Sequence, residues 1–369
     1  MIRFRLQMIL SVAGICAVTL APSAQTPLMK TGSVVQGATM LSPRSGHTAT
    51  LLADGRVLIA GGMRRNQDFY RSAKPFDPAT GRFITTGEML VARVGHAAVL
   101  LGSGKILIVG GWIGHGVTDE AELYDPQTGK FSAIAHMLTK RGQPSATLLR
   151  DGNVLIACGA GDNDGSGSSM VSAEIFDAAK LTFRATGAMH HARISGTATL
   201  LTDGRVLLAG GRGLEVNATA ELYDPKSGTF TETGHMITAR YKHTAGLLPD
   251  GRVLQAGNSD ERDWRGNLSS AELFDPKHGT FSAASSLNEA RFKLPPAVQL
   301  PSGRLLIAGG SRQAKIYDQG VGRFTLVAGD MIDGRHFMTE TLLADGRVLL
   351  TGGYANTPEA TTQTWVYKP

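Results

Sequence analysis

The feature that most constrains this chain is a predicted β-hairpin that occurs seven times. Its first copy covers residues 46–62 and reads G-H-T-A-T-L-L-A-D-G-R-V-L-I-A-G-G. Two β-prone runs flank Asp54-Gly55, a pair that can adopt the positive φ angles of a type I′ turn. The other copies cover residues 96–111, 145–159, 197–211, 243–258, 296–310 and 338–353.

The turns of these hairpins give the repeat length. They fall at residues 54–55, 103–104, 151–152, 203–204, 250–251, 302–303 and 345–346, and each is an Asp-Gly or Ser-Gly pair. A period of about fifty residues that holds a four-strand pattern is typical of a propeller blade. We therefore expect an all-β, seven-bladed propeller with four antiparallel strands per blade. Repeats share their core with neighbours, so we expect one domain over residues 25–369 despite the length of the chain.

Each repeat contains the four strands of such a blade. The first hairpin strand consists of small residues, such as Thr48-Ala49-Thr50, which suit the crowded innermost strand a. The return strand b, residues 57–60 in the first copy, is apolar on both faces. Strand c reads A-E-L-Y-D-P in its clearest copies, and strand d begins at an aromatic residue. These aromatic residues are Phe83, Phe131, Phe183, Phe230, Phe281 and Phe324.

The last repeat lacks a fourth strand after its strand c, near residues 363–367. The N-terminal region contains a matching segment, because residues 31–44 mirror residues 86–93 apart from an insertion. We therefore expect residues near 29–39 to supply strand d of the last blade. This pairing would close the ring and remove the exposed sheet edges.

Residues 1–24 have the order of a secretory signal peptide. Arg3 and Arg5 precede an apolar run over residues 8–20, and small residues follow at 21–24. The run is too short to cross a bilayer, so we expect a periplasmic or secreted protein with no membrane span. A lipid anchor on Cys16 is a competing interpretation, although Ile15 precedes it. Cleavage leaves Cys158 without a partner for an intrachain disulfide.

The charge pattern argues against nucleic acid as a partner. The formal net charge is +6, and the basic residues are spread along the chain without a basic run. No stretch combines clustered Lys and Arg with interleaved aromatic residues. We expect a monomer whose partner is a carbohydrate or another protein.

The double glycine and the aromatic at fixed offsets resemble the kelch-repeat family, in its bacterial form related to galactose oxidase. That resemblance implies a copper-radical oxidase, whose site needs a cysteine cross-linked to a tyrosine, a second tyrosine and two histidines. Here Cys158 stands at the first glycine position of the pair after strand b, and Tyr241-Lys242-His243 is the nearest approach to a Tyr-His pair. We therefore expect no copper site, no other metal and no cofactor. A second relative, the exported sialic acid epimerase, has no motif that maps onto this chain.

An arginine recurs in every repeat and has two interpretations. Arg44, Arg93, Arg141, Arg193, Arg240 and Arg335 each lie eleven residues before the turn glycine, and Arg291 lies twelve before Gly303. The arginines could form structural salt bridges with the recurring glutamates of strand c, Glu122, Glu174, Glu221 and Glu272. Alternatively, their guanidinium groups ring the mouth of one face and attract anions. On the second interpretation Arg44, Arg93, Arg193, Arg240 and Arg335 bind ligand.

The connections between strands b and c emerge on the same face as the arginines and vary most between repeats. Exposed aromatic rings beside fixed polar groups are what a sugar-binding surface needs, although the rings could instead pack under their loops. The candidate ligand-binding residues in these loops are Trp112, His115, Asp260, Trp264 and Tyr354.

Two further patterns favour structural explanations. His47, His96 and His243 share one register before strand a, which indicates hydrogen bonding at the strand start rather than a metal site. Residues 162–168 resemble part of a calcium loop, but position twelve is Ala173 rather than a carboxylate. We assign no catalytic residue, and we expect a ligand-binding module. A cofactor-free, sugar-active enzyme of the epimerase or lyase type, acting on the same face, is the alternative.

Overall fold

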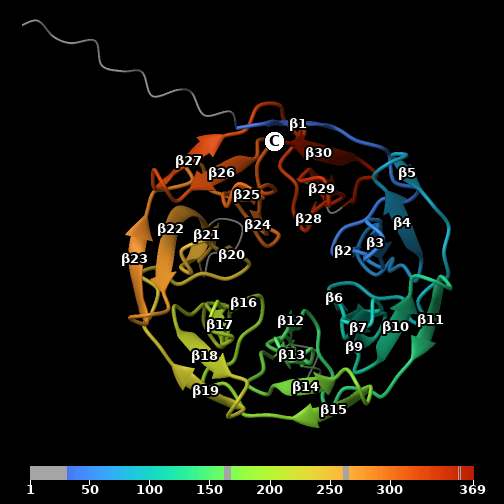
Figure 1. The fold of residues 1–369 in the computed structure, drawn as a ribbon, viewed down its shortest axis with the longest axis horizontal. Coiled ribbons are helices and arrows are strands. Elements are labelled where there is room, and N and C mark those ends of the chain that lie inside the picture. The colour runs from blue at the N-terminus through green and yellow to red at the C-terminus, as the bar shows by residue number, and fades with distance from the viewer. Residues whose placement is uncertain (1–30, 162–167, 261–265, 356, 358) are drawn as a thin grey trace, which may run out of the picture. The chain divides into compact units, whose positions relative to one another are not determined.

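The computed structural model describes residues 31–161, 168–260, 266–355, 357 and 359–369. Within residues 31–369, seven four-stranded antiparallel sheets surround a central channel (Figure 1). The predicted fold class, blade number and strand order are therefore confirmed. The predicted signal peptide, residues 1–24, lies outside the described residues.

Blades one to four follow one another along the chain, each with its innermost strand first. Their strands are β2 (Thr48–Leu51), β3 (Val57–Ala60), β4 (Ala73–Asp77) and β5 (Arg82–Phe83); β6 (Ala97–Leu100), β7 (Ile106–Val109), β10 (Ala121–Asp125) and β11 (Lys130–Ala133); β12 (Ser145–Leu148), β13 (Val154–Ala157), β14 (Glu174–Asp177) and β15 (Thr182–Ala185); β16 (Thr197–Leu200), β17 (Val206–Ala209), β18 (Ala220–Asp224) and β19 (Thr229–Glu232).

Blades five to seven complete the ring, and a small hairpin decorates blade two. Their strands are β20 (Thr244–Leu247), β21 (Val253–Ser259), β22 (Asn267–Asp275) and β23 (Thr280–Ala284); β24 (Val298–Gln299), β25 (Leu305–Ile307), β26 (Lys315–Asp318) and β27 (Arg323–Leu326); β28 (Thr339–Leu342), β29 (Val348–Thr351), β30 (Thr364–Lys368) and β1 (Ser33–Gln36). The added hairpin pairs β8 (Trp112–Ile113) with β9 (Gly116–Val117).

The N-terminal strand closes the ring, as predicted. β1 runs antiparallel to β30, with Ser33 opposite Lys368 and Gln36 opposite Trp365, so both ends of the described chain meet in blade seven (Figure 1). Val34 also donates a backbone hydrogen bond of 2.8 Å to Ala328 O in blade six. This strand therefore joins the last two blades and covers the outer edge of β30.

The core lies between neighbouring sheets. Strand b is buried along its whole length in blade after blade, and β3 and β7 are examples. One apolar cluster joins Leu58 and Ala60 of blade one to Ile106, Ile108 and Tyr124 of blade two. At the outer edge, the aromatic residue that begins strand d contacts an aromatic of strand c, for instance Phe131 with Tyr124 at 4.7 Å between ring centroids.

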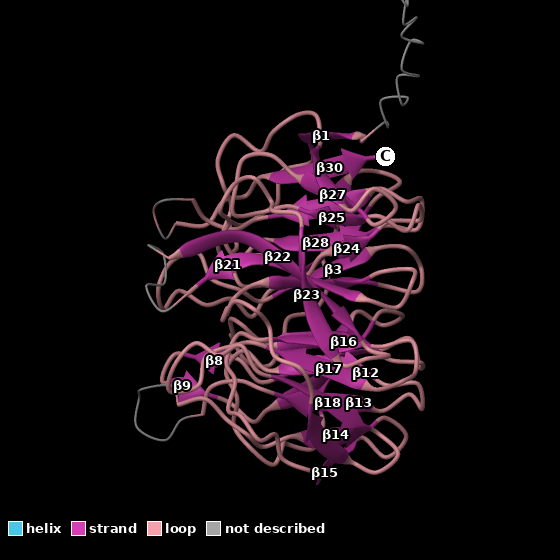
Figure 2. Ribbon diagram, turned by 90° about the vertical axis from the view of Figure 1, so that its left-hand side faces the viewer, coloured by secondary structure: helices cyan, strands magenta, loops and turns pink. Residues whose placement is uncertain are grey.

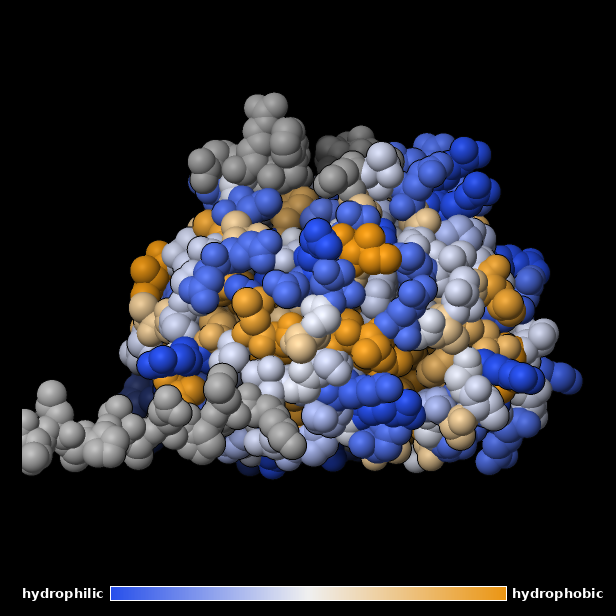
Figure 3. Space-filling view, turned by 90° about the horizontal axis from the view of Figure 1, so that it is seen from above, coloured by the Kyte–Doolittle hydropathy of each residue, from blue (hydrophilic) through white to orange (hydrophobic). Residues whose placement is uncertain are grey.

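The two faces of the ring differ in their connections. We call the side with the a–b turns the turn face and the side with the b–c connections the loop face. Figure 2 shows the β8–β9 hairpin and the long ends of β21 and β22 on the same side, which is the loop face. Figure 3 looks onto the rim near β1, where hydrophobic side chains form a band broken by hydrophilic ones. Val35 of β1 and Leu326 of β27 are among the exposed apolar residues.

Candidate functional site

The mouth of the channel on the loop face is encircled by seven residues at one register. Each lies two positions after the recurring arginine, in the linker that joins strand d of one blade to strand a of the next. We call this set the annulus, and it consists of Gly46, Gly95, Gln143, Ser195, Lys242, Lys293 and Phe337.

Hydrogen bonds connect the annulus from blade to blade. The amide of Gly95 donates to Gly46 O at 2.9 Å, and the amide of Gln143 donates to Gly95 O at 2.9 Å. The same bond joins Gly46 to Phe337, Lys242 to Ser195, and Phe337 to Lys293. At the junction of blades three and four, the hydroxyl of Ser195 donates to Gln143 Oε1 at 2.7 Å. The mouth is therefore a continuous rim rather than a set of independent loops.

Every residue of the annulus has a left-handed backbone conformation. The φ angles of the non-glycine members are +50° for Gln143, +55° for Ser195, Lys242 and Lys293, and +53° for Phe337. This conformation costs an L-residue about 1 kcal/mol, whereas glycine adopts it freely. Blades one and two use glycine here, so the other five blades retain a side chain at a measurable cost.

These five side chains line a cavity of about 350 Å³ in the channel. Its deeper wall is formed by strand a of blades three and four, including Thr147, Thr197 and Thr199. A second hollow of about 640 Å³ runs outward over blade four and shares Gln143, Ser195 and Lys242 with the first. The mouth therefore opens into a groove on the loop face.

Two lysines of the annulus lie among aromatic rings. Lys293 Nζ lies 4.6 Å from the ring centroid of Phe292 and 5.2 Å from that of Phe337, and it donates a 2.8 Å hydrogen bond to the hydroxyl of Tyr354. Lys242 Nζ lies 5.3 Å from the same Phe292 ring. Ammonium groups are attracted to the faces of aromatic rings. Two cations are thus held beside one ring at the mouth.

Tyr354 and Trp112, two of the predicted ligand-binding residues, occupy one register directly after the double glycine. Tyr354 packs against His336, with 5.6 Å between ring centroids, and it contacts Lys293 as described above. Trp112 is half-buried, and its indole lies so close to the annulus that a Cβ at Gly95 would come within 3.0 Å of it. The structure therefore places both aromatic residues at the rim of the mouth.

The predicted arginines do not line the mouth. Five arginines are buried, with exposed fractions of 7 % or less, and their guanidinium groups contact residues near the end of strand b or before strand c of their own blade. They are Arg44, Arg93, Arg193, Arg240 and Arg335. A buried guanidinium that donates to backbone carbonyls is not presented to a ligand. The predicted ligand-binding role of these five residues therefore has no support in the structure, because the linker points them into the blade.

The predicted salt bridges between arginine and strand-c glutamate are present in four blades. The ion pairs are Arg93 with Glu122 at 2.7 Å, Arg141 with Glu174 at 3.2 Å, Arg193 with Glu221 at 2.9 Å and Arg240 with Glu272 at 2.6 Å. Each glutamate also accepts a backbone N–H from the linker, at 2.7 Å from His190 in blade four. The pairs therefore fasten the linker to strand c.

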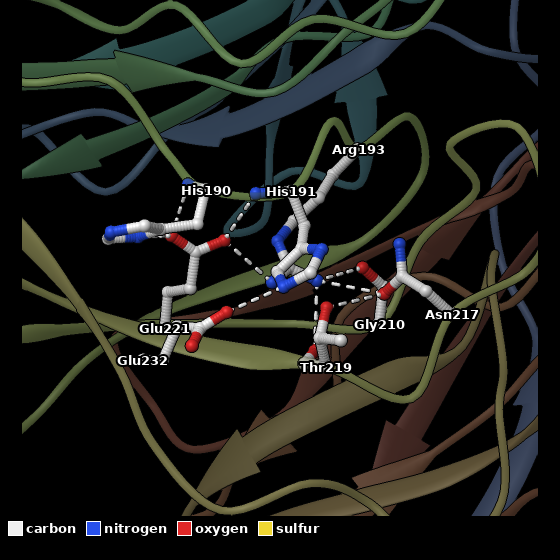
Figure 4. Close-up of polar contacts among 8 residues, drawn as sticks. All are labelled: His190, His191, Arg193, Gly210, Asn217, Thr219, Glu221 and Glu232. Atoms are coloured by element: carbon white, nitrogen blue, oxygen red, sulfur yellow. Dashed lines mark hydrogen bonds and ion pairs between the residues drawn. The ribbon is translucent and has the colours of Figure 1, made fainter.

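Figure 4 shows this arrangement in blade four. Arg193 donates to the carbonyls of Gly210 and Thr219 at 2.7 and 2.9 Å and to Glu221. Burial would raise the pKa of Glu221, but the His190 amide and the Arg193 charge hold that pKa below its ordinary value. The carboxylate therefore stays ionised inside the blade.

The three recurring histidines have the predicted structural role. His47, His96 and His243 are buried, and their Nε2 atoms lie 2.8 Å from Thr351 Oγ1, 2.9 Å from Thr48 Oγ1 and 3.3 Å from Thr197 Oγ1 respectively. Each contact crosses to the preceding blade. Burial and the neighbouring arginine lower the pKa of His47 and of His243 to about 3, so both rings are neutral at physiological pH.

The other predicted site residues are not brought to the mouth as one group. His115 is exposed at the tip of the β8–β9 hairpin, and Asp260 is half-buried at the end of β21. Trp264 and residues 162–167 of the calcium-like loop lie outside the described residues. Cys158 is buried, as expected for a glycine replacement, and burial raises the pKa of its thiol.

Comparison with known proteins supports the fold. A model described as "Kelch motif" matches residues 92–138, which lie in blade two and the linker after it. A solved structure titled "Novel fungal alcohol oxidase with catalytic diversity among the AA5 family, in complex with copper" aligns over 92 % of this chain and 76 % of that chain. Its TM-score is 0.72 and its sequence identity is 17 %. No curated protein matches the chain. The chain thus contains one segment that matches the kelch motif, and its propeller fold is similar to that of a copper oxidase.

The described residues do not fit a copper centre. They contain no group of three or more His, Cys, Asp or Glu side chains that could hold a metal ion. The annulus instead presents the ammonium groups of Lys242 and Lys293, which repel a metal cation. Among the described residues there is also no helix with the length and apolar character needed to cross a membrane.

Proposed function

We propose that this protein is a ligand-binding propeller that holds a saccharide at the loop-face mouth of its channel. One observation carries the proposal: five annulus residues keep a side chain in a left-handed conformation, and all five line the same cavity. Strain of this kind is retained where side chains have a function that glycine cannot supply. Packing alone would favour glycine, as in blades one and two.

The chemistry of the rim suits a hydroxyl-rich ring. Gln143 and Ser195 supply an amide and a hydroxyl whose positions are set by their mutual hydrogen bond. Phe337 supplies an apolar ring in the cavity, and Trp112 and Tyr354 lie beside the annulus. A sugar needs both kinds of surface, because its hydroxyl groups require fixed polar partners and its C–H face packs on aromatic rings.

We further propose that the protein works as a monomer outside the cytoplasm. Export is supported by the order of basic, apolar and small residues over 1–24, which is typical of a secretory signal. Binding of an extracellular protein and turnover of a sugar on the same face are the competing functions, and the assay below reports both binding and turnover.

Substitution of annulus residues by glycine tests the proposal. We expect Gln143→Gly and Ser195→Gly to abolish binding of monosaccharides in calorimetric titrations while stability is unchanged or rises by about 1 kcal/mol, because backbone strain is relieved. The panel consists of galactose, glucose, N-acetylglucosamine and galacturonate, with product analysis by NMR for turnover.

Leu181 provides a matched control for this experiment. It has a φ of +57° and lies in the c–d turn of blade three on the opposite face. Leu181→Gly should relieve the same strain and leave binding unchanged. The proposal is wrong if the two annulus variants lose stability and keep their affinity, or if the wild-type protein binds none of the four sugars.

A further inference from the structure

We infer that the saccharide is acidic, and that its carboxylate sits between Lys242 and Lys293 while the rest of the chain follows the groove over blade four. This inference rests on the proposed function and specifies the class of ligand. It follows from how the two lysines are held, from the charge of blade six and from the shape of the hollow.

The two ammonium groups lie beside the same aromatic ring. Both contact the ring of Phe292, Lys293 Nζ at 4.6 Å and Lys242 Nζ at 5.3 Å from its centroid. They reach the same ring from adjacent blades, and both lysines line the 350 Å³ cavity. An anion between two like charges lowers their mutual repulsion and gains two charge-assisted hydrogen bonds.

The surrounding blade adds to the positive potential. Arg291 and Lys315 of blade six are buried beside each other, and Lys315 stands where blades two to five have a glutamate. Arg312 of the same blade is paired with Asp330 at 2.9 Å. A sector with an excess of one charge attracts oppositely charged ligands to the cleft it lines. The acidic end of a ligand would therefore be drawn toward blades five and six.

The hollow over blade four has room for more than one sugar. It measures about 640 Å³ and is lined by Ser169, Ile194, Arg212 and Leu214 in addition to the three side chains it shares with the channel. The shared residues, Gln143, Ser195 and Lys242, lie at the junction of the two spaces. A terminal acid in the mouth would thus be followed by sugar units that lie across blade four.

Oligogalacturonates provide probes with a neutral counterpart. We would measure the affinities of mono-, di- and trigalacturonate and of their methyl esters, which retain the sugar but carry no charge. We expect each acid to bind at least tenfold more tightly than its ester at low ionic strength. We also expect the trimer to bind more tightly than the monomer, and Arg212→Ala to remove that gain.

Lysine variants identify the contact. Lys293→Met and Lys242→Met should each bring the affinity for the acids down to that for the esters, because methionine keeps the apolar stem and removes the charge. Lys226→Met is the control, since Lys226 is exposed on the turn face. Thermal melting of each variant shows whether the fold is retained, and Lys→Arg at each position should restore part of the preference.

The outcomes separate this inference from the proposed function. Equal affinity for acid and ester, or an acid preference that survives both lysine variants, overturns the inference and leaves a neutral saccharide site. Binding of a neutral sugar but of no galacturonate has the same meaning. Tighter binding of an acidic peptide such as tetraglutamate than of trigalacturonate would show a peptide site instead. If no sugar of any kind binds, the proposed function also fails.

Discussion

Each blade contains one buried arginine at the recurring position, and blades two to five differ from blades six, seven and one in what neutralises its charge. In the first group, strand c supplies a glutamate that contacts the guanidinium. In the second group, the same position is held by Lys315, Trp365 and Lys74. These three blades are adjacent once the ring is closed, so one sector of the propeller contains buried arginines without the strand-c acid.

The arginines of that sector use other contacts. Arg44 donates to the carbonyls of Gly61 and Ser72 at 2.6 and 2.9 Å, and Arg335 lies 5.5 Å from the ring centroid of Trp365. Burial lowers the pKa of Arg44 and of Arg291 to about 10, so both remain charged at neutral pH. The positive charge of this sector therefore has two sources: it lacks the strand-c glutamates of blades two to five, and it has lysines at two of those positions.

Removal of one glutamate from the paired group should have the largest effect. Glu272→Gln leaves Arg240 buried without its counterion, and we expect the free energy of unfolding in urea to fall by about 3–5 kcal/mol. Glu232→Gln is the control, because that carboxylate is exposed in its pair with His191, and it should change stability by less than about 1 kcal/mol. Similar losses in both variants would show that the buried ion pair between linker and strand c stabilises the fold no more than an exposed pair does.

Blade seven, in the second group, contains an acid, Glu340, that should make the stability of the protein depend on pH. Glu340 stands in strand a of blade seven where the other blades have alanine, and it accepts a 2.7 Å hydrogen bond from the amide of Ala308. Ala308 follows β25, and the partner of β25, β24, begins only after Pro295-Pro296, where Pro296 has no N–H for the ladder. Burial raises the pKa of Glu340 from 4.5 to about 8.

The direction in which stability changes with pH follows from where the proton binds. Between pH 4.5 and 8 the folded protein keeps a proton on Glu340 that the unfolded chain releases, so stability falls as pH rises through this window. Compared with Glu340→Gln, we expect the wild-type protein to lose about 1.4 kcal/mol per pH unit there. Urea titrations of both proteins at pH 5.5, 6.5 and 7.5 measure the difference. Parallel profiles would contradict the prediction.

A glutamate placed in the unpaired group should have the smallest effect, and its sign is opposite. Lys315 lies beside Arg291, and burial together with that charge lowers the pKa of Lys315. Lys315→Glu would restore the pairing of blades two to five, and we expect a gain of about 1 kcal/mol in stability. Lys277→Glu, on an exposed turn, serves as the control. A loss of stability in Lys315→Glu would show that the linker of blade six cannot form the pair.

The sequence predicted the fold well because its strongest signals are local and repeated. Strand b of blade one was expected at residues 57–60, and β3 spans Val57–Ala60. The ring closure was predicted because residues 31–44 resemble residues 86–93, and the last repeat lacked a fourth strand. These features depend on the order of residues alone.

The site was harder to predict because it depends on where each side chain points and on how close it lies to the channel. The arginines and the annulus lie two residues apart, yet Arg240 points into its blade and Lys242 lines the channel. A sequence does not give the left-handed turn that separates them. A signal was present: the annulus position reads Gly, Gly, Gln, Ser, Lys, Lys and Phe around the ring while the neighbouring arginine is constant. Tyr354 and Trp112 were predicted by the same kind of variation.

The closing strand also has a consequence for the order of folding. Ser33–Gln36 pair with Thr364–Lys368, at the opposite end of the described residues. Completion of the circle is therefore a late event that involves the most distant contacts in the chain, which are the slowest to form. A circular permutant that joins the two ends and opens between blades three and four would complete blade seven early and delay another.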